Sequence, residues 1–453
     1  MKIIKRLGCL IIAIFMSVMF VACGNNSNNN NNNENNNGGE NPLVQYTVTF
    51  KVDDTIFLVK KVASGCLVEK PKTDPSKENL NFVGWYDGET EWDFEENIVT
   101  KDLTLTAKFL GDYDKDNYKI IATKEQLIAY ASNVENYTVN ARLYSDINLG
   151  GMEWTPISSN PGMDTETEEL KNVYSATFDG NGHTIKNYKI SSNVQEGLGT
   201  PYVGFFGLID YATICNLNLS DFIIDIVDYE AKTGIMVGGL VGGITQANVV
   251  NCSVKGSINL EVSNNCTELD GFCVGGLVGM TIYGLAESST VSNCYSMVNI
   301  NFQGISGSSF NCFGGLIGMY SSRGSIVSNC YSTGNINMNL IENEGAESCV
   351  GGFIGLANDF IEILNSYATG NINVMYSGDD NVAVGGFVSI SRAVIENCYR
   401  YNGQIISAPS GSEICEEGIS ADMQTIWKFV TENWDSDIWN LYTDKNPTLK
   451  EIK

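Results

Sequence analysis

The chain has 453 residues and a formal net charge of −26 at pH 7, and 43% of its residues are hydrophobic. This length and hydrophobic share allow one large domain or two to three ordinary ones with their own cores. The sequence argues against a nucleic-acid-binding protein, because no run of Lys and Arg occurs beyond the N-terminus.

Residues 1–22 have the pattern of an export signal. A basic start precedes an apolar stretch at 10–20, and the sequence FVAC follows. FVAC resembles the bacterial lipobox, although Phe20 stands where Leu is usual. The resemblance implies a lipidated Cys23, whose acyl chains would anchor an exported protein to the membrane at the bacterial cell surface. A plain secretory signal with a chance cysteine is the alternative.

An asparagine-rich tract follows, so residues 23–43 are predicted to form a lipid-bearing linker. The tract has almost no apolar side chains to bury and cannot offset the entropy that ordering would cost. A flexible tether is its expected role.

Residues 44–110 are predicted to form a small β-rich module. YTVTF and LTLTAKF alternate apolar and polar residues, as half-buried strands do. Together with FVGWYDG and WDF, they resemble the internalin-type B repeat, also called the Listeria–Bacteroides repeat. The resemblance implies a β-grasp-like fold that serves as a spacer or protein-contact module. Trp85 and Trp92 are interpreted as core residues rather than a ligand platform, because so small a domain needs large aromatics.

Residues 111–117 are predicted to be a linker. Asp112, Asp114 and Asp116 have the D-x-D-x-D spacing that opens a calcium loop, but the glycine and glutamate required later in such a loop are missing. A solvated linker is therefore favoured over a calcium site, and no other cofactor is expected.

Residues 118–203 are predicted to form an N-terminal cap and the first coils of a larger structure. TKEQLIAYASNV has the pattern of a short helix, with Thr123 and Gln126 placed as a capping box. The runs after it are rich in Tyr, Ile and turn residues, which is typical of short strands.

A repeat occupies residues 204–400. The cores GFFG, GLVG, GLVG, GLIG, GFIG and GFVS begin at 204, 239, 276, 315, 352 and 386, in steps of 35, 37, 39, 37 and 34 residues. Such a period indicates stacked supersecondary units, and no unit has a convincing helical pattern. We expect a β-solenoid, a right-handed parallel β-helix with short capping helices and three short strands in each coil.

Stacked coils place equivalent residues about 4.8 Å apart, so like residues should form ladders. We expect an apolar ladder, a glycine ladder at tight corners or positive φ, and an asparagine ladder whose amides pair at another corner. Cysteines in register should stack as buried thiols, with vertical disulfides as the alternative. The ladder residues are Leu240, Leu277, Leu316 and Phe353; Gly239, Gly276, Gly315, Gly352 and Gly386; Asn251, Asn293, Asn329, Asn365 and Asn397; Cys252, Cys294, Cys330 and Cys398; and, as a second thiol set, Cys273, Cys312 and Cys349.

The array resembles the GLUG repeat family, named for its G-L-x-G core, whose members occur in bacterial surface proteins, adhesins and some IgA-cleaving metallopeptidases. Ser389 replaces the second glycine in the last copy, as is common in terminal repeats. Residues 401–453 are predicted to form a C-terminal cap, with a helix at 419–433, that covers the open edge of the last coil.

Catalysis is not expected. His183 is the only histidine, so the zinc motif H-E-x-x-H of the peptidase members is absent, and no nucleophile motif accompanies it. We interpret His183 as a turn residue. A carbohydrate lyase or hydrolase that uses clustered carboxylates on one face of the solenoid is the less favoured alternative.

The favoured function is a surface-anchored binding or adhesion protein for an extracellular protein or glycan. Inserts of varying length lie in one register between coils and should project from one side, where repeat proteins commonly bind. These inserts are 263–272, 303–310, 341–348 and 376–381. A non-catalytic stalk or spacer is the alternative.

Overall fold

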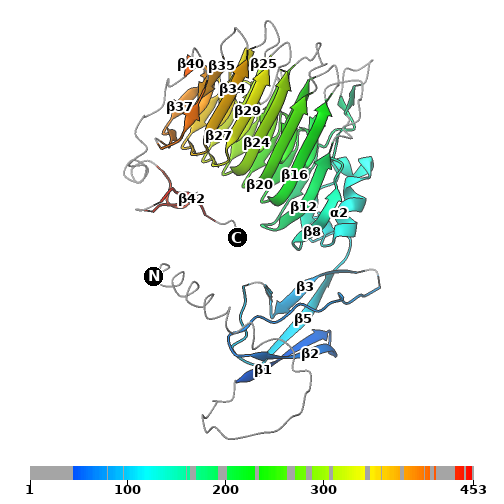
Figure 1. Cartoon of the computed structure of the whole chain (residues 1–453). Helices are drawn as coiled ribbons and strands as arrows, with labels where there is room; N and C mark the ends of the chain where they lie inside the picture. Colours follow the sequence, from blue (N-terminus) through cyan, green and yellow to red (C-terminus); the bar gives the residue numbers. More distant parts are fainter. Residues whose placement is uncertain are drawn as a thin grey trace, which may run out of the picture.

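Two β structures follow one another along the chain, a small sheet and then a long solenoid of stacked coils (Figure 1). Several predicted segments lie outside the described residues: the signal, Cys23, the asparagine-rich linker and the helix at 419–433. Most residues of the predicted inserts also lie outside them. The computed structural model describes residues 44–450 apart from 79, 95, 160, 164–169, 192–200, 230–233, 263–270, 282–287, 306–309, 342–346, 359, 378–381, 402, 409–412, 415–433 and 443–444.

The N-terminal module is a five-stranded mixed sheet. Its strands are β1 (Gln45–Val52), β2 (Thr55–Ala63), β3 (Asn81–Asp87), β4 (Thr90–Glu91) and β5 (Leu103–Leu110). The order is β2-β1-β5-β3-β4, with β1 and β5 parallel at the centre and antiparallel neighbours outside them. Trp85 packs edge-on against Phe50, with ring centroids 4.9 Å apart, and is 1% exposed. Trp85 is therefore a core residue, as predicted, whereas Trp92 is only half-buried.

The solenoid is built from four parallel sheets, which we name A to D in the order in which each repeat contributes a strand to them. Sheet A consists of β13 (Tyr202–Val203), β17 (Ile235–Gly238), β21 (Phe272–Gly275), β25 (Phe310–Gly314), β30 (Glu347–Gly351), β35 (Val382–Gly385) and β40 (Glu413–Ile414). Sheet B consists of β14 (Phe206–Asp210), β18 (Val241–Thr245), β22 (Val278–Thr281), β26 (Ile317–Tyr320), β31 (Ile354–Ala357) and β36 (Val388–Ser391).

Sheets C and D begin before the repeats and continue through them. Sheet C consists of β6 (Lys119–Ile121), β7 (Ala141–Leu143), β11 (Thr177–Asp179), β15 (Thr213–Cys215), β19 (Asn248–Val250), β23 (Thr290–Ser292), β27 (Ile326–Ser328), β32 (Glu362–Leu364) and β37 (Val394–Glu396). Sheet D consists of β8 (Ile147–Glu153), β12 (Thr184–Ser191), β16 (Asn218–Tyr229), β20 (Ser253–Val262), β24 (Tyr295–Ile305), β28 (Tyr331–Ser332), β29 (Ile336–Ile341), β33 (Tyr367–Ala368), β34 (Ile372–Ser377), β38 (Tyr399–Arg400) and β39 (Ile406–Ser407). Two short hairpins lie outside these sheets, β9 (Gly162–Met163) with β10 (Leu170–Lys171), and β41 (Trp439–Asn440) with β42 (Thr448–Leu449).

The parallel β-solenoid predicted from the repeats is confirmed, but the prediction of three strands per coil is wrong. Each full coil crosses four sheets, because the repeat core bends at its Gly-Leu step. In one coil β17 ends at Gly238, the chain turns through Gly239 and Leu240, and β18 starts at Val241. One apolar run in the sequence therefore supplies two strands.

The core of the solenoid consists of like residues stacked coil on coil. The apolar ladder is confirmed: Leu240, Leu277 and Leu316 are all 0% exposed. The backbone N–H of Leu240 donates to the carbonyl of Leu277 (3.0 Å), and Leu277 donates to Leu316 (2.8 Å). Phe353 and Phe387 continue the row with stacked rings 4.6 Å apart. Each coil thus buries its apolar residues against those of the next coil.

The glycine and asparagine ladders have different backbone requirements. The five ladder glycines do not have a positive φ; instead a Cβ at Gly315 would overlap the carbonyl oxygen of Gly352 in the next coil. The positive φ belongs to the asparagine ladder, whose residues lie between sheets C and D with φ from 47° to 56°. Asparagine tolerates this left-handed conformation better than other non-glycine residues do.

A short helix covers the first coils. In α2 (Lys124–Ala131) the Thr123 hydroxyl accepts from the N–H of Gln126, whose side chain accepts from the N–H of Thr123, so the predicted capping box is confirmed. Leu127 and Tyr130 of α2 are 0% exposed and belong to the solenoid core. A 3₁₀ turn, η1 (Val134–Thr138), leads on to β7. None of the helices within the described ranges has the length and apolarity needed to cross a membrane.

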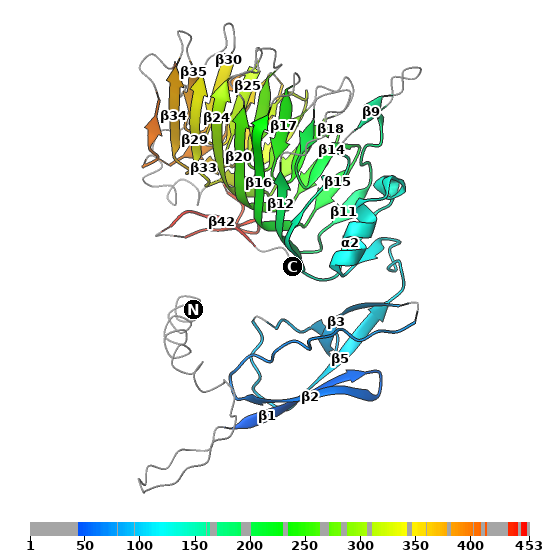
Figure 2. The same ribbon diagram turned by 45° about the vertical axis from the view of Figure 1, so that its right-hand side comes forward.

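The described end of the chain packs on a flank of the solenoid rather than across its open edge. Tyr295, Tyr331 and Tyr367 form an outer stack with ring centroids 4.8 and 5.0 Å apart. Trp434 and Trp439 pack on this tyrosine row, and the Tyr367 hydroxyl donates to the carbonyl of Pro447 (2.6 Å). Figure 2 shows β42 beside the coils. The tryptophans pack here because stacked tyrosines offer large apolar rings. The cap over the open edge stays a prediction, since residues 415–433 lie outside the described residues.

All nine described cysteines are reduced thiols. In the first predicted set the Cys252 N–H donates to the Cys294 sulfur (3.3 Å), and the Cys294 N–H donates to that of Cys330 (3.4 Å). Cys398 lies in the same register and is 3% exposed. Burial raises the pKa values of the Cys252 and Cys294 thiols well above the usual range.

We expect these thiols to be protected from alkylation in the native chain. Iodoacetamide should modify Cys252, Cys294 and Cys330 on the order of 100-fold more slowly in native protein than in urea, because the buried sulfurs become accessible only when a coil opens. Peptide mass spectrometry after timed quenching measures both rates. Equal rates, or disulfide-linked peptides in a non-reduced digest, would contradict this arrangement.

Candidate functional site

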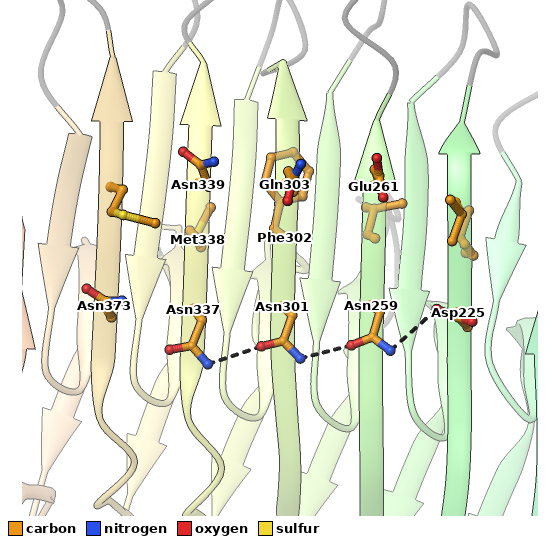
Figure 3. A pocket seen from close by; sticks show the side chains of 14 residues that line it. Asp225, Asn259, Glu261, Asn301, Phe302, Gln303, Asn337, Met338, Asn339 and Asn373 are labelled. Atoms are coloured by element: carbon orange, nitrogen blue, oxygen red, sulfur yellow. Dashed lines mark hydrogen bonds between the residues drawn. The ribbon is translucent and has the colours of Figure 1, made fainter.

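Sheet D carries a row of amide side chains on its outer surface, running from coil to coil across the strands. Parallel pairing places the members of this row opposite one another in successive strands. We call it the amide row; it begins at the carboxylate of Asp225 and continues with the amides of Asn259, Asn301, Asn337 and Asn373. Figure 3 shows these side chains side by side on β16, β20, β24, β29 and β34.

The amides of the row are linked to one another. The Nδ2 of Asn259 donates to the carboxylate of Asp225 (3.4 Å), Asn301 donates to the Oδ1 of Asn259 (2.9 Å), and Asn337 donates to that of Asn301 (3.1 Å). An amide has two N–H donors and an oxygen with two lone pairs. A linked amide therefore keeps one N–H and one lone pair for a ligand, and both repeat at the coil spacing of about 4.8 Å.

A neighbouring row of asparagines serves the backbone instead. The Oδ1 of Asn299 accepts from the backbone N–H of Asn335 (3.0 Å), Asn335 accepts from Asn371 (2.8 Å), and Asn371 accepts from Ile405 (2.9 Å). These bonds lie where the later coils of sheet D break into two strands, so the side chains replace missing ladder bonds. This second row fixes the strands that carry the amide row.

The amide row lies in a shallow groove of ≈ 260 Å³. Exposed apolar residues stand at its ends, Val227 (40% exposed) and Met375 (55% exposed). The charges lie in the earlier coils, where Asp225 pairs with Lys189 at 3.2 Å and Glu261 lines the groove. Over the later coils the row is uncharged. The groove therefore suits an extended neutral ligand that both donates and accepts hydrogen bonds.

The predicted ladders do not line this groove. The Nδ2 of Asn251 donates to the Oδ1 of Asn216, and Asn397 donates to Asn365, each at 3.1 Å, so these amides pair at the corner between sheets C and D. The indole N–H of Trp439 donates to Asn329 at 3.5 Å. Sequence reasoning missed the amide row, although the recurring Asn-Ile-Asn in three successive coils is its signal: residues 299–301, 335–337 and 371–373.

The aspartates of the linker hold an arginine rather than standing in solvent. The guanidinium of Arg142 contacts Asp114 (2.7 Å), Asp116 (3.1 Å) and Asp179 (2.8 Å), and the side chain of Asp114 is only 3% exposed. The prediction of a solvated linker is therefore wrong at Asp114. Within the described part of the chain, no group of three or more His, Cys, Asp and Glu is arranged to hold a metal ion.

His183 lies in a turn, as predicted, and also faces the N-terminal module. Its backbone N–H donates to Gly180 (2.8 Å), and its Nδ1 lies 3.3 Å from the Asp146 carboxylate. Both side chains line a second cleft, between the module and the first coils.

Family models match two parts of the chain. Residues 46–108 match the Listeria-Bacteroides repeat domain, and residues 233–259 and 346–373 match the GLUG motif. The two resemblances stated from the sequence are thereby confirmed.

Two curated relatives match part of the chain. The immunoglobulin A1 protease of Streptococcus sanguinis is 27% identical over 201 residues, which are 44% of this chain and 9% of that protein. Internalin H of Listeria monocytogenes is 32% identical over 127 residues, which are 25% of this chain and 22% of that protein. The matches span so little of both relatives that they carry over neither protein's activity.

A solved structure has a similar fold. A Bacteroides ovatus protein, provisionally designated an immunoglobulin A1 protease, superposes with a TM-score of 0.53 and 20% sequence identity. The superposition covers 76% of this chain and 95% of that chain. At this identity the likeness shows the fold alone.

Proposed function

We propose that this chain is an exported, lipid-anchored surface protein that binds an extended neutral glycan along the amide row. The observation that carries the proposal is the linked, solvent-facing row of asparagine amides on sheet D. Sugar hydroxyls donate and accept hydrogen bonds at once, which matches the N–H and lone pair that each amide retains. The export signal and the likeness to an internalin and a protease support a place at the cell surface.

A glycan fits this site better than a polypeptide does. Extended peptides usually bind sheets by adding a strand at a free edge, where backbone groups are unpaired. The amide row is on a face whose backbone is already paired with neighbouring coils. A polyanion is disfavoured by the net charge of −26 and by the two carboxylates in the groove.

The binding role is proposed to be non-catalytic. The curated relative named as a protease matches over a region that is 9% of its own length, and this chain has a single histidine. A spacer that only holds other surface components outward is the second candidate, favoured by the uninterrupted stack of coils.

Alanine at Asn301, Asn337 and Asn373 together should weaken glycan binding at least about tenfold. Each substitution removes one or two ligand hydrogen bonds, worth roughly 0.5–1.5 kcal/mol each. The full chain is first tested on a panel of neutral polysaccharides, and calorimetry then compares the triple variant with wild type on the best binder. The matched control replaces Glu362 and Glu396, which are exposed on sheet C, by alanine, and it should bind as wild type does. Unchanged affinity of the triple variant would refute this site, and binding to no glycan would favour the spacer.

A further inference from the structure

The N-terminal module is packed against the first coils of the solenoid. Val83 of β3 is 1% exposed and clusters with Ile120 and Ala122 of the first coil. The Gln126 amide of α2 donates to the Asn81 side chain at 2.7 Å, on the same strand of the module. Figure 1 shows β3 on the side of the module that adjoins these coils. The two parts therefore meet through apolar packing and a hydrogen bond between their side chains.

A cleft of ≈ 370 Å³ lies at this junction and draws its lining from both parts. Its volume is in the range of small-molecule sites. The module contributes aromatic rings, with Phe82, Trp92 and Phe94 half-buried and Trp85 fully buried. We call it the junction cleft.

Both hydrogen-bond acceptors and potential donors surround the aromatic rings. Glu91 and Asp146 are exposed carboxylates from opposite sides, and His183 and Lys70 are potential donors. The carboxylate of Glu91 lies close to the backbone of Gly84, where a Cβ would stand 2.8 Å from its Oε1. Gly84 has φ +153°, a conformation that residues with a Cβ rarely adopt, so glycine there also avoids backbone strain. A side chain at this position would displace Glu91.

Two buried indole N–H groups of the residues that line the cleft lack an acceptor. Trp85 is 1% exposed, and its indole N–H has no hydrogen-bond partner among the described residues. The half-buried Trp92 has the same unpaired indole N–H. A buried donor without an acceptor destabilises the fold, because it has lost its hydrogen bond to water. Both indole nitrogens are closed to solvent, so the polar contacts of a bound ligand fall to the other donors and acceptors of the cleft.

We propose that the junction cleft binds the ring of a neutral sugar. A sugar ring has apolar C–H faces that suit aromatic side chains, and a rim of hydroxyls that can donate to carboxylates and accept from Lys70 or His183. An anion is disfavoured by the carboxylates of Asp74, Asp93 and Glu91. A cation would find Asp146 already paired with His183 and Asp74 already paired with Lys70.

This site is separate from the amide row, and its test does not depend on the proposed function. The full chain is titrated with neutral monosaccharides and disaccharides while tryptophan fluorescence is followed, because Trp92 lines the cleft. At least one sugar should give a saturable change. Glu91→Gln keeps the shape but removes the charged acceptor, and it should weaken that sugar at least about tenfold. Glu89→Gln, in the adjacent exposed turn, is the matched control and should bind as wild type does.

A second variant and a second ligand class keep the test decisive. His183→Asn should also weaken the sugar, and thermal unfolding of each variant shows whether the fold persists. The triple alanine variant of the amide row should bind the same small sugar normally. The proposal is overturned if no neutral sugar saturates the signal, if Glu91→Gln binds as wild type does, or if choline binds in place of sugars.

Discussion

Replacing Gly315 by alanine is expected to lower the free energy of unfolding by about 3 kcal/mol or more. The added Cβ would overlap the carbonyl oxygen of Gly352 and approach the Cβ of Ser332 within 3.1 Å. Relief by a local shift is difficult, because the N–H of Gly315 donates to the carbonyl of Gly351 at 3.1 Å and ties the coils together. Urea denaturation followed by circular dichroism measures the loss.

Gly111→Ala is the matched control for this substitution. No atom lies within 4 Å of a Cβ at Gly111, and its φ is not positive. Its effect should stay within about 0.5 kcal/mol, and the restriction that alanine places on the unfolded chain acts in the stabilising direction. Equal effects of the two substitutions would show that the coils can separate to admit a methyl group.

Replacing Arg142 by alanine is expected to destabilise the chain by about 3–5 kcal/mol at neutral pH. The guanidinium bonds three carboxylates, and the substitution leaves Asp114 with its side chain 3% exposed and no cation beside it. Arg142→Lys should give an intermediate loss, because an ammonium keeps the charge but lacks the fork that spans several carboxylates. Lys115→Ala removes an exposed cation from the same linker and should change stability by no more than about 0.5 kcal/mol.

The loss should depend on pH. Burial, the largest single effect, would raise the pKa of Asp114, but backbone N–H donors, the Tyr144 hydroxyl and the Arg142 charge together hold it below its usual value. A carboxyl whose pKa is lowered by folding stabilises the native state above its unfolded pKa, near 4, and loses this contribution as the pH falls further. The difference between wild type and Arg142→Ala should therefore be largest at neutral pH and shrink toward pH 3. A constant difference across this range would contradict the assignment.

Local and periodic features could be predicted from the sequence. The capping box at Thr123 and Gln126 needs residues three apart, and the leucine ladder needs only a repeat of known period. The stacking of coils turns that period directly into contacts. The bend at Gly239 was missed, because an apolar run of this length reads as one strand until its neighbours in the stack are known.

Features that join distant segments could not be predicted in this way. Asp114 reads as a solvated residue until Arg142, from a strand of the first coils, is brought against it. The junction cleft combines Glu91 with Asp146 and His183, which become neighbours only when the module docks. The amide row could have been predicted, because alternation in a strand puts both asparagines of Asn-Ile-Asn on the outer face. What the sequence did not reveal is that one of the two serves the backbone.

Because sheet D is built from stacked coils, the number of ligand contacts along the amide row depends on the number of repeats in the chain. Four successive coils each supply one asparagine and pair only with their two neighbours. Gaining or losing one such repeat by recombination would therefore lengthen or shorten the row by about 4.8 Å and leave the remaining contacts unchanged. Binding strength along such a row would rise with each added coil through multivalency, without any new kind of residue. The length of the binding row would therefore change only in steps of one coil.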